Sequence, residues 1–275
     1  TAWRPPNVSE LYSFGKHSAS IEYGLWRYTQ QEDDQIVTDQ VLDSNDKAAP
    51  SEVGIKWINT YEMLEEKYQW EITAYANLIQ NYIYTTPAGI TQTVRGAFPY
   101  FIYEQDDALL AGIDANLLYQ HTPKLSSEFR GSFLWAKNLE QQDFFVGLPP
   151  ASLNYQLLFE LPDAGILKNQ LLSGELSYTF RQFFAPRVIT IDEILAAKTE
   201  ERNLFAESSA DFDLLPPPDG YFLAGLSWQI DIYAFQVGVQ VRNIFNARFR
   251  NYTDRLRYFS DERGRNVQLN LRYIF

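Results

Sequence analysis

The sequence predicts an all-β fold, an antiparallel up-and-down β-barrel that spans a membrane. Three observations support this prediction. Aromatic residues make up 16% of the 275 residues, and aromatic side chains favour strands. Apolar and polar residues alternate with a period of two over many long segments, as they do in strands with one apolar face. The connections between these segments alternate between short and long, which is typical of the turns and outer loops of an outer-membrane barrel.

The alternation predicts about nine strands. The last of them is the clearest, because Val267, Leu269 and Leu271 fall on one face while polar residues fall on the other. Many of the strands exceed the usual ~5–6 residues and suit a membrane span of about 9–11 tilted residues. The predicted strands cover residues 52–64, 67–87, 97–122, 125–138, 152–162, 168–184, 219–230, 234–248 and 264–275.

The predicted connections differ in length. Short turns are expected near 65–66, 122–124, 163–167 and 231–233, whereas the connection 185–218 has 34 residues. Within it, residues 190–201 predict a short helix capped by Thr190, with acidic residues in the first turn. Residues 1–51 are expected to form mainly an outer loop, although 19–28 could supply a tenth strand. An odd strand number that starts outside suggests the C-terminal part of a larger barrel.

The composition argues against several kinds of site. Cysteine is absent, which excludes disulfides, thiolate metal ligands and cysteine nucleophiles. The only histidines, His17 and His121, are far apart in sequence, so a histidine-based zinc site or catalytic triad is not favoured. The net charge of −12 argues against nucleic acid as a partner. No run of eighteen apolar residues predicts a transmembrane helix.

Particular residues resemble TonB-dependent receptors of the bacterial outer membrane. The first residues read AWRPPNVSELYS, and the element Asn243-Ile244-Phe245-Asn246 precedes the last outer loop. A second element, Gly264-Arg265-Asn266, opens the final strand, and Phe275 closes it. The stretch Asp107–Asp114 is similar to a recurrent barrel segment of the family. The two ends carry the specific part of the resemblance.

The resemblance implies a 22-stranded barrel with an N-terminal plug domain, of which this chain would be the last nine strands without the plug. It implies a receptor that takes up a scarce solute, such as a ferric siderophore or a haem- or cobalamin-like molecule, with energy from TonB acting through the missing plug region. Further partners would be outer-membrane lipid, lipopolysaccharide and the barrel-insertion machinery. In this family the last strand is an assembly signal, here Leu271, Tyr273 and Phe275.

The last outer loop, 246–263, is a candidate ligand-contacting surface. Arginine and tyrosine together recognise anions and rings, which would suit an anionic metal chelate. The same residues could instead bind lipopolysaccharide phosphates or pair within the chain and hold the loop in shape. The candidate residues are Arg248, Arg250, Tyr252, Arg255, Arg257 and Tyr258.

Residues 29–52 carry the opposite charge, with a net of −6. A calcium site is conceivable there, but the ligand spacing of a calcium-binding loop is absent, so a solvated outer loop is the better interpretation. Glu175 and Arg181 are expected to point into the lumen. We expect no catalytic, cofactor-binding or metal-ligating residues. The alternatives are an outer-membrane enzyme barrel of about ten strands and a soluble β-sandwich binding module.

Overall fold

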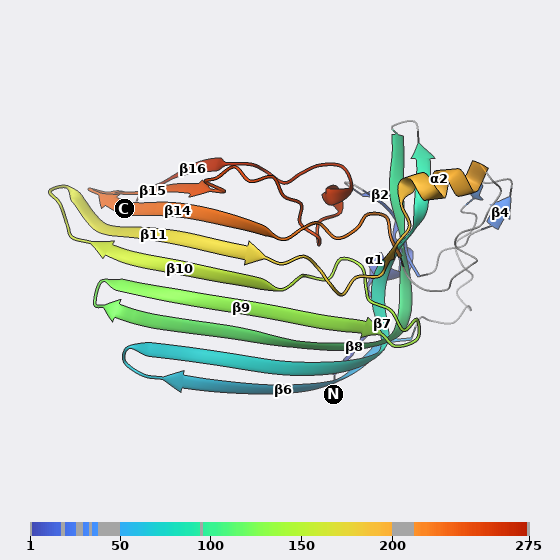
Figure 1. The fold of residues 1–275 in the computed structure, drawn as a ribbon, viewed down its shortest axis with the longest axis horizontal. Helices are drawn as coiled ribbons and strands as arrows, with labels where there is room; N and C mark the ends of the chain where they lie inside the picture. The colour runs from blue at the N-terminus through green and yellow to red at the C-terminus, as the bar shows by residue number, and fades with distance from the viewer. Residues whose placement is uncertain are drawn as a thin grey trace.

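Nine long strands form one curved antiparallel sheet, in which each strand pairs with its neighbours along the chain (Figure 1). The computed structural model describes residues 2–17, 20–25, 30–32, 35–37, 50–93, 96–199 and 212–273. All nine predicted strands are confirmed. They are β6 (Glu52–Leu64), β7 (Tyr68–Thr93), β8 (Gly96–Thr122), β9 (Leu125–Asn138), β10 (Ser152–Leu161), β11 (Leu167–Thr179), β14 (Tyr221–Ile232), β15 (Phe235–Arg242) and β16 (Asn266–Tyr273).

Some strand ends differ from the prediction. β15 stops at Arg242 instead of residue 248, because Asn243 adopts a left-handed φ of 49°. The amide nitrogen of its side chain donates to the carbonyl of Ala247 at 2.9 Å, which fixes a turn where the strand was expected to continue. β7 and β8, in contrast, run to Thr93 and from Gly96, so most of the loop expected between 87 and 97 is strand.

The two ends of the sheet differ in their connections. At one end, short turns join β6 to β7, β8 to β9, β10 to β11 and β14 to β15, as predicted (Figure 1). The opposite end, here called the outer end, carries the long connections. They contain β12 (Arg187–Val188), α2 (Ile191–Thr199), β13 (Phe212–Asp213) and the 3-10 turn η1 (Arg255–Tyr258). The predicted helix is confirmed as α2, where Thr190 and Glu193 form reciprocal capping hydrogen bonds.

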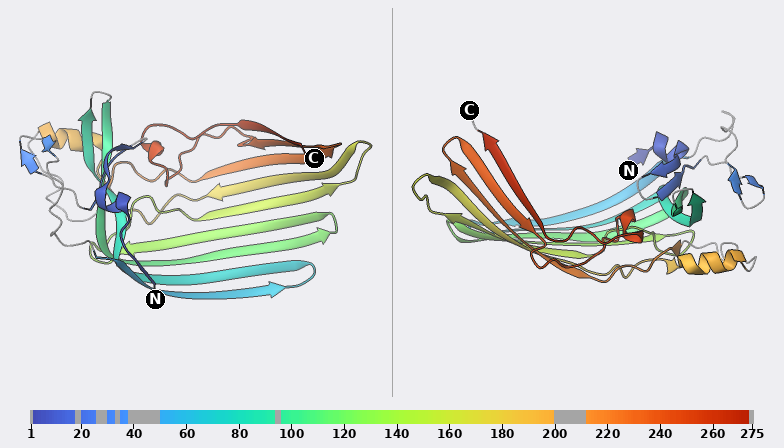
Figure 2. Two further views of the ribbon diagram at one scale, coloured as in Figure 1. Left: turned by 180° about the vertical axis from the view of Figure 1, so that it is seen from behind. Right: turned by 90° about the horizontal axis from the view of Figure 1, so that it is seen from above.

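The β7–β8 hairpin bends sharply and crosses the outer end of the sheet (Figures 1 and 2). The register between the two strands shifts between Ile79 and Tyr82, which marks a β-bulge. Asn81 lies in this bulge with a φ of 55°, and its backbone N–H donates to Asp107 Oδ1 at 3.0 Å. A bulge bends the strand that carries it, so the distal half of the hairpin leaves the wall.

The N-terminal residues contain β1 (Ala2–Arg4), α1 (Val8–Tyr12), β2 (Phe14–His17), β3 (Ser20–Tyr23), β4 (Gln30–Glu32) and β5 (Gln35–Val37). β1 pairs antiparallel with the start of β6, and β3 pairs in parallel with Tyr100–Ile102 of the distal part of β8. The described part of the expected tenth strand over 19–28 is therefore a four-residue addition to the bent hairpin, and the expectation of a further spanning strand there is wrong.

The two faces of the wall differ in chemistry. One face exposes large apolar side chains, such as Trp57, Leu226 and Leu269. The other face is polar and contains two grooves of about 360 and 310 Å³, both lined by Glu71 and Asn116. On this polar face Tyr75 lies directly over its cross-strand partner Gly112, so closely that a Cβ at 112 would lie 2.3 Å from the tyrosine hydroxyl.

Buried apolar clusters lie at the outer end. One contains Ile90, Ile189, Ile194, Phe212 and Leu214, and it joins the tip of the hairpin to the 185–218 connection. The other contains Tyr84, Ala108, Ala136 and Phe145, close to the bend. None of the helices in the described ranges has both the length and the apolar character needed to cross a membrane.

Candidate functional site at the outer end

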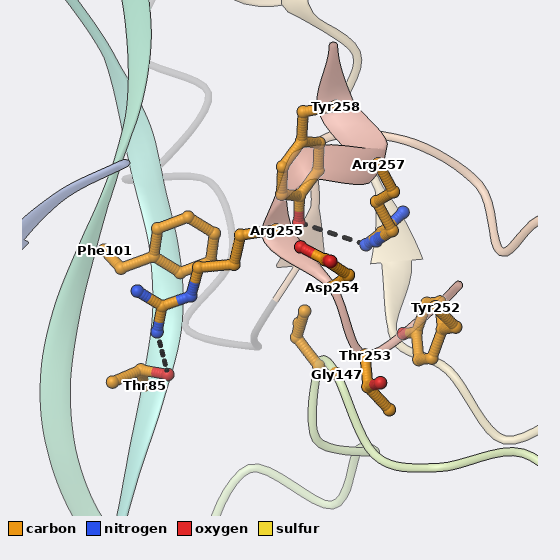
Figure 3. A pocket seen from close by; sticks show the side chains of 10 residues that line it. Thr85, Phe101, Gly147, Tyr252, Thr253, Asp254, Arg255, Arg257 and Tyr258 are labelled. Atoms are coloured by element: carbon orange, nitrogen blue, oxygen red, sulfur yellow. Dashed lines mark hydrogen bonds between the residues drawn. The ribbon is translucent and has the colours of Figure 1, made fainter. Parts of the chain in front are cut away.

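The turn η1 directs two arginines away from each other. Asp254 caps the turn by accepting a hydrogen bond from the backbone N–H of Leu256 at 2.8 Å. Arg255 then extends toward the β7–β8 hairpin, whereas Arg257 extends to the opposite side (Figure 3). One short turn therefore places two cations against different parts of the outer end.

Arg257 forms a buried ion pair with Asp213 of β13, and their side chains are only 3% and 1% exposed. Its guanidinium lies between the rings of Tyr252 and Tyr258, 4.7 and 4.4 Å from their centroids. Tyr258 also donates its hydroxyl hydrogen bond to Asp213 Oδ1 at 2.7 Å. Burial, followed by the negative charge of Asp213, raises the pKa of Tyr258 well above its ordinary value, so this hydroxyl keeps its proton and remains a donor.

Arg255 forms a second ion pair, with Glu22 of β3. The same guanidinium donates to Ser20 Oγ at 3.1 Å and to Thr85 Oγ1 at 2.9 Å, and it lies 4.2 Å from the ring centroid of Phe101. Burial lowers the pKa of Arg255 below its ordinary value. The pair is nevertheless partly open to solvent, because the side chains of Arg255 and Glu22 remain 30% and 15% exposed.

A cavity of about 140 Å³ lies between these two ion pairs (Figure 3). Thr85, Phe101 and Arg255 line one side, and Tyr252 and Arg257 line the other. The hydroxyl of Tyr252 is buried near the backbone of Gly147 and the carboxylate of Asp213, but among the described residues it makes no hydrogen bond of ordinary geometry. A buried polar group of this kind calls for water or a polar ligand group. The cavity is large enough for a few water molecules or one small functional group.

The structure brings together four of the six predicted loop residues. Tyr252, Arg255, Arg257 and Tyr258 line the cavity. Arg250 supports the loop from within, since it donates to Asp261 at 2.8 Å and to the carbonyl of Arg257 at 2.7 Å. Arg248 is exposed and does not line the cavity. Ligand contact by these six residues stays a prediction.

Sequence reasoning missed the partners of these arginines. Asp213 lies 44 residues from Arg257, and Glu22 lies 233 residues from Arg255. Thr85 and Phe101 come from the bent hairpin, whose bend has no glycine or proline signal in the sequence. No periodic pattern connects residues at such separations, so only the folded arrangement reveals these contacts.

Two of the three residues of the predicted assembly signal lie on the last strand, β16. Leu271 and Tyr273 are exposed on one face of β16, and the ring of Tyr273 lies 5.2 Å from that of Phe235 on β15. Phe275 lies outside the described residues. The role of these three residues in assembly stays a prediction.

The other sequence candidates are dispersed. Most of the acidic segment 29–52 lies outside the described residues, but Glu52 pairs with Arg4 at 2.8 Å. His121 Nε2 lies 2.8 Å from Ser127 Oγ near a short turn, and the side chain of His17 lies outside the described part. Arg181 forms an exposed ion pair with Asp219. Within the described ranges, no group of three or more His, Cys, Asp or Glu residues could hold a metal.

Glu175 belongs to the wall. It faces Gly225 across the β11–β14 pair, and a Cβ at 225 would lie 3.9 Å from its Oε2. Among these candidates, the outer-end residues around η1 form the site with the most buried charge.

Comparison with known proteins gives matches of structure but not of sequence. No protein-family model matches the chain, and no curated protein sequence matches it. Among solved structures, the copper transporter OprC matches with a TM-score of 0.67 and 15% identity, covering 100% of this chain and 36% of OprC.

Two further solved structures show the same likeness. A mutant of the ferric enterobactin receptor PfeA from Pseudomonas aeruginosa matches with a TM-score of 0.59 and 17% identity, over 98% of this chain and 36% of the receptor. The FrpB iron transporter from Neisseria meningitidis matches with a TM-score of 0.57 and 12% identity, over 82% of this chain and 32% of the transporter. The chain spans about a third of the length of these structures. It has the fold of part of the barrel of TonB-dependent receptors, the family that its end motifs resemble.

Proposed function

We propose that the chain forms part of the barrel wall and the outer connections of an outer-membrane receptor that takes up a scarce solute. The solute class that fits best is a metal chelate, such as a ferric siderophore, or a haem- or cobalamin-like molecule. The observation that carries the proposal is the match of 82 to 100% of the chain to a copper transporter, an iron transporter and a ferric enterobactin receptor. Such uptake needs no covalent chemistry from the barrel.

The two faces of the wall support the membrane part of the proposal. A barrel in lipid exposes an apolar outer face and encloses a polar, wet lumen, and the wall has one face of each kind. In this proposal lipid and lipopolysaccharide contact the apolar side. The barrel-insertion machinery reads Leu271 and Tyr273 of the last strand together with Phe275. TonB supplies energy through a plug region that is not part of this chain.

A solute would meet the outer end first. The four arginines of the last connection differ in solvent exposure. They are Arg248, Arg250, Arg255 and Arg257. Arg257 is almost fully buried and paired, whereas Arg248 is exposed and Arg255 is partly exposed beside the cavity. Arg250 is also partly exposed, but its guanidinium is held by Asp261 and by the carbonyl of Arg257. Arg248, which is exposed, and Arg255, which lines the cavity, are therefore the cations best placed to contact an anionic solute.

A binding and uptake screen of the complete receptor tests the solute class. Purified receptor would be titrated with ferric siderophores, haem, cobalamin and glycans, and uptake would be measured in cells with and without TonB. We expect micromolar or tighter binding of one metal chelate and uptake that requires TonB. Binding of none of these, or uptake that does not depend on TonB, would contradict the proposal.

A matched pair of substitutions tests the membrane wall. Leu226 lies near the middle of β14 on the apolar face, and Gln229 lies on the other face of the same strand. A lipid-facing arginine near the bilayer midplane costs about 2–4 kcal/mol. Leu226→Arg should therefore reduce the amount of folded barrel in the membrane, and Gln229→Arg should leave it nearly unchanged. Equal loss from both would count against a lipid-facing wall.

A further inference from the structure

The polar face of the wall is not uniform in charge. Between the bend of the β7–β8 hairpin and the short turns, β6–β11 carry mainly carboxylates on this face. They are Glu62, Glu71, Asp114, Glu128, Glu160 and Glu175. Among the described residues, the cations on the same part of the face are Lys56 and Arg130, and Arg130 pairs with Glu128 at 2.7 Å. This part of the face therefore repels an anion.

The polar face of β15 and β16 carries the opposite charge. Arg242 lies at the outer end of β15, and Arg272 lies at the short-turn end of β16. Both side chains are exposed, and within the described ranges neither forms an ion pair. The carboxylate of Asp231 on β14 is held by the side-chain amides of Gln236 and Asn169 instead. Two uncompensated cations thus lie at the two ends of this strip.

Uncharged side chains fill the space between the two arginines. On the polar face, Gln240 lies opposite Gln268, and Gly238 lies opposite Asn270. A side-chain amide offers both donors and an acceptor without a net charge. Such groups can replace the water around a polar solute, and they bind it less strongly than an ion pair would.

The strip continues into exposed arginines of the last outer connection. Arg248, Arg263 and Arg265 are exposed. Arg265 directly precedes β16, and Arg242 is the last residue of β15. An anion that contacts the last connection therefore meets a further cation at the point where the wall begins.

Salt limits how far these charges act. At physiological ionic strength the Debye length is about 8 Å, so a solute in a wet lumen responds mainly to the nearest part of the wall. Residues 236 and 242 are about 20 Å apart on β15, and Arg272 lies opposite residue 236. The fields of Arg242 and Arg272 therefore cover most of the strip.

We propose that the polar faces of β15 and β16 form an anion track, along which an anionic solute passes from the outer end toward the short turns. The carboxylates of β6–β11 keep the same solute away from the rest of the described wall. This inference rests on the proposed function, because it assigns a sign of charge and a side of the lumen to the solute of that receptor.

Charge-selective labelling of the complete receptor, in cells that contain TonB, tests the track. This chain has no cysteine, so single cysteines can be introduced once any cysteine elsewhere in the receptor is replaced. Gln240→Cys and Asn270→Cys report the track, and Thr73→Cys, opposite Asp114 and two residues from Glu71, reports the acidic part. Each is reacted with two thiosulfonates of similar size, one carrying a sulfonate and one a trimethylammonium group. The ratio of the two rates, relative to that of a free thiol, measures the local preference for anions.

The rate ratio should exceed one at residues 240 and 270 and fall below one at residue 73. Arg242→Gln should lower the ratio at 240 about threefold, and Arg272→Gln should do the same at 270, because removing a charge about 7 Å away affects the two reagents in opposite directions. The matched control is Lys56→Gln, which removes a cation from the polar face outside the track and should change neither ratio.

Two labelling results would overturn the track. One is a ratio of one or less at both 240 and 270. The other is no reaction of either reagent at these two positions, since another part of the receptor would then cover the strip.

Uptake of the siderophores, haem and cobalamin used in the binding screen separates the track from the proposed function. The double variant Arg242→Gln, Arg272→Gln should take up the transported solute severalfold more slowly than Lys56→Gln. Equal uptake by these two variants would sink the track alone. If the unaltered receptor takes up none of these solutes, the proposed function fails, and the labelling ratios still decide whether the strip attracts anions.

Discussion

The strand wall and the outer cluster around η1 are held together in opposite ways. In the wall each strand pairs with its neighbours along the chain through a regular backbone ladder, and many side chains on its apolar face remain exposed. In the outer cluster the contacts join residues up to 235 positions apart, and two of the partners, Arg257 and Asp213, are charged and buried. The wall therefore depends on backbone pairing and on its surroundings, whereas the outer cluster depends on a few specific side chains.

The largest expected effect comes from the buried ion pair of the outer cluster. Asp213→Asn leaves the charge of Arg257 buried without its partner, which should destabilise the outer cluster by about 3–5 kcal/mol. Hydrogen exchange of β13 and α2 would measure this local opening. The control is Asp219→Asn, which breaks an exposed pair with Arg181 and should cost about 1 kcal/mol or less. If β13 and α2 are equally protected from hydrogen exchange in the two variants, the buried ion pair stabilises the outer cluster no more than an exposed one does.

Gly112 is a position in the wall where an added methyl group would clash with its neighbours, as it would in a close-packed core. Gly112→Ala would place a Cβ 2.3 Å from the Tyr75 hydroxyl and 2.6 Å from the carbonyl oxygen of Phe133. Overpacking of this kind costs about 1–3 kcal/mol, measurable as a lower denaturant midpoint of the complete barrel. Gly174→Ala on β11 has open space around its Cβ and serves as the control.

A double variant sharpens this second prediction. Adding Tyr75→Ala to Gly112→Ala removes the contact with the ring but not the one with the Phe133 backbone. The denaturant midpoint should therefore recover only in part. Full recovery would mean that the tyrosine alone requires glycine at 112, and no loss in Gly112→Ala would mean that the wall adjusts freely.

The bend between the wall and the outer cluster depends on Asn81. Its left-handed φ of 55° costs about 1–2 kcal/mol for a residue with an ordinary side chain, and most for a β-branched one. Asn81→Val should lower the thermal midpoint, whereas Asn81→Gly should change it little. If both variants melt alike, the left-handed backbone at residue 81 imposes no measurable cost on a β-branched side chain.

The smallest effect is expected at the helix α2. Thr190→Ala removes the hydroxyl that accepts from the Glu193 N–H at 3.3 Å and should cost about 1 kcal/mol of local helix stability. Thr190→Ser keeps the hydroxyl and should retain most of it. Hydrogen exchange in α2 distinguishes the two, and equal exchange rates would show that the cap contributes nothing measurable.

The contrast between the two regions also explains what the sequence could predict. The strands of the wall follow from alternation within each segment, as Val267, Leu269 and Leu271 illustrate, and the capped helix α2 follows from residues within one turn. The ion pairs of the outer cluster depend on how distant segments meet. The bulge at Asn81 follows from an inserted residue in the pairing of β7 with β8, which no local pattern records.

The bent β7–β8 hairpin has a consequence for exchanging outer connections between related barrels. β3 pairs with Tyr100–Ile102 of the hairpin, the last connection contacts Thr85 and Phe101, and the 185–218 connection packs on Ile90. Because all three segments rest on the hairpin, no one of them is an independent module. A graft of the last connection alone would bring Arg255 and Arg257 to a host without Glu22 and Asp213. Exchange between barrels therefore has to carry the hairpin, β3 and both connections as one block.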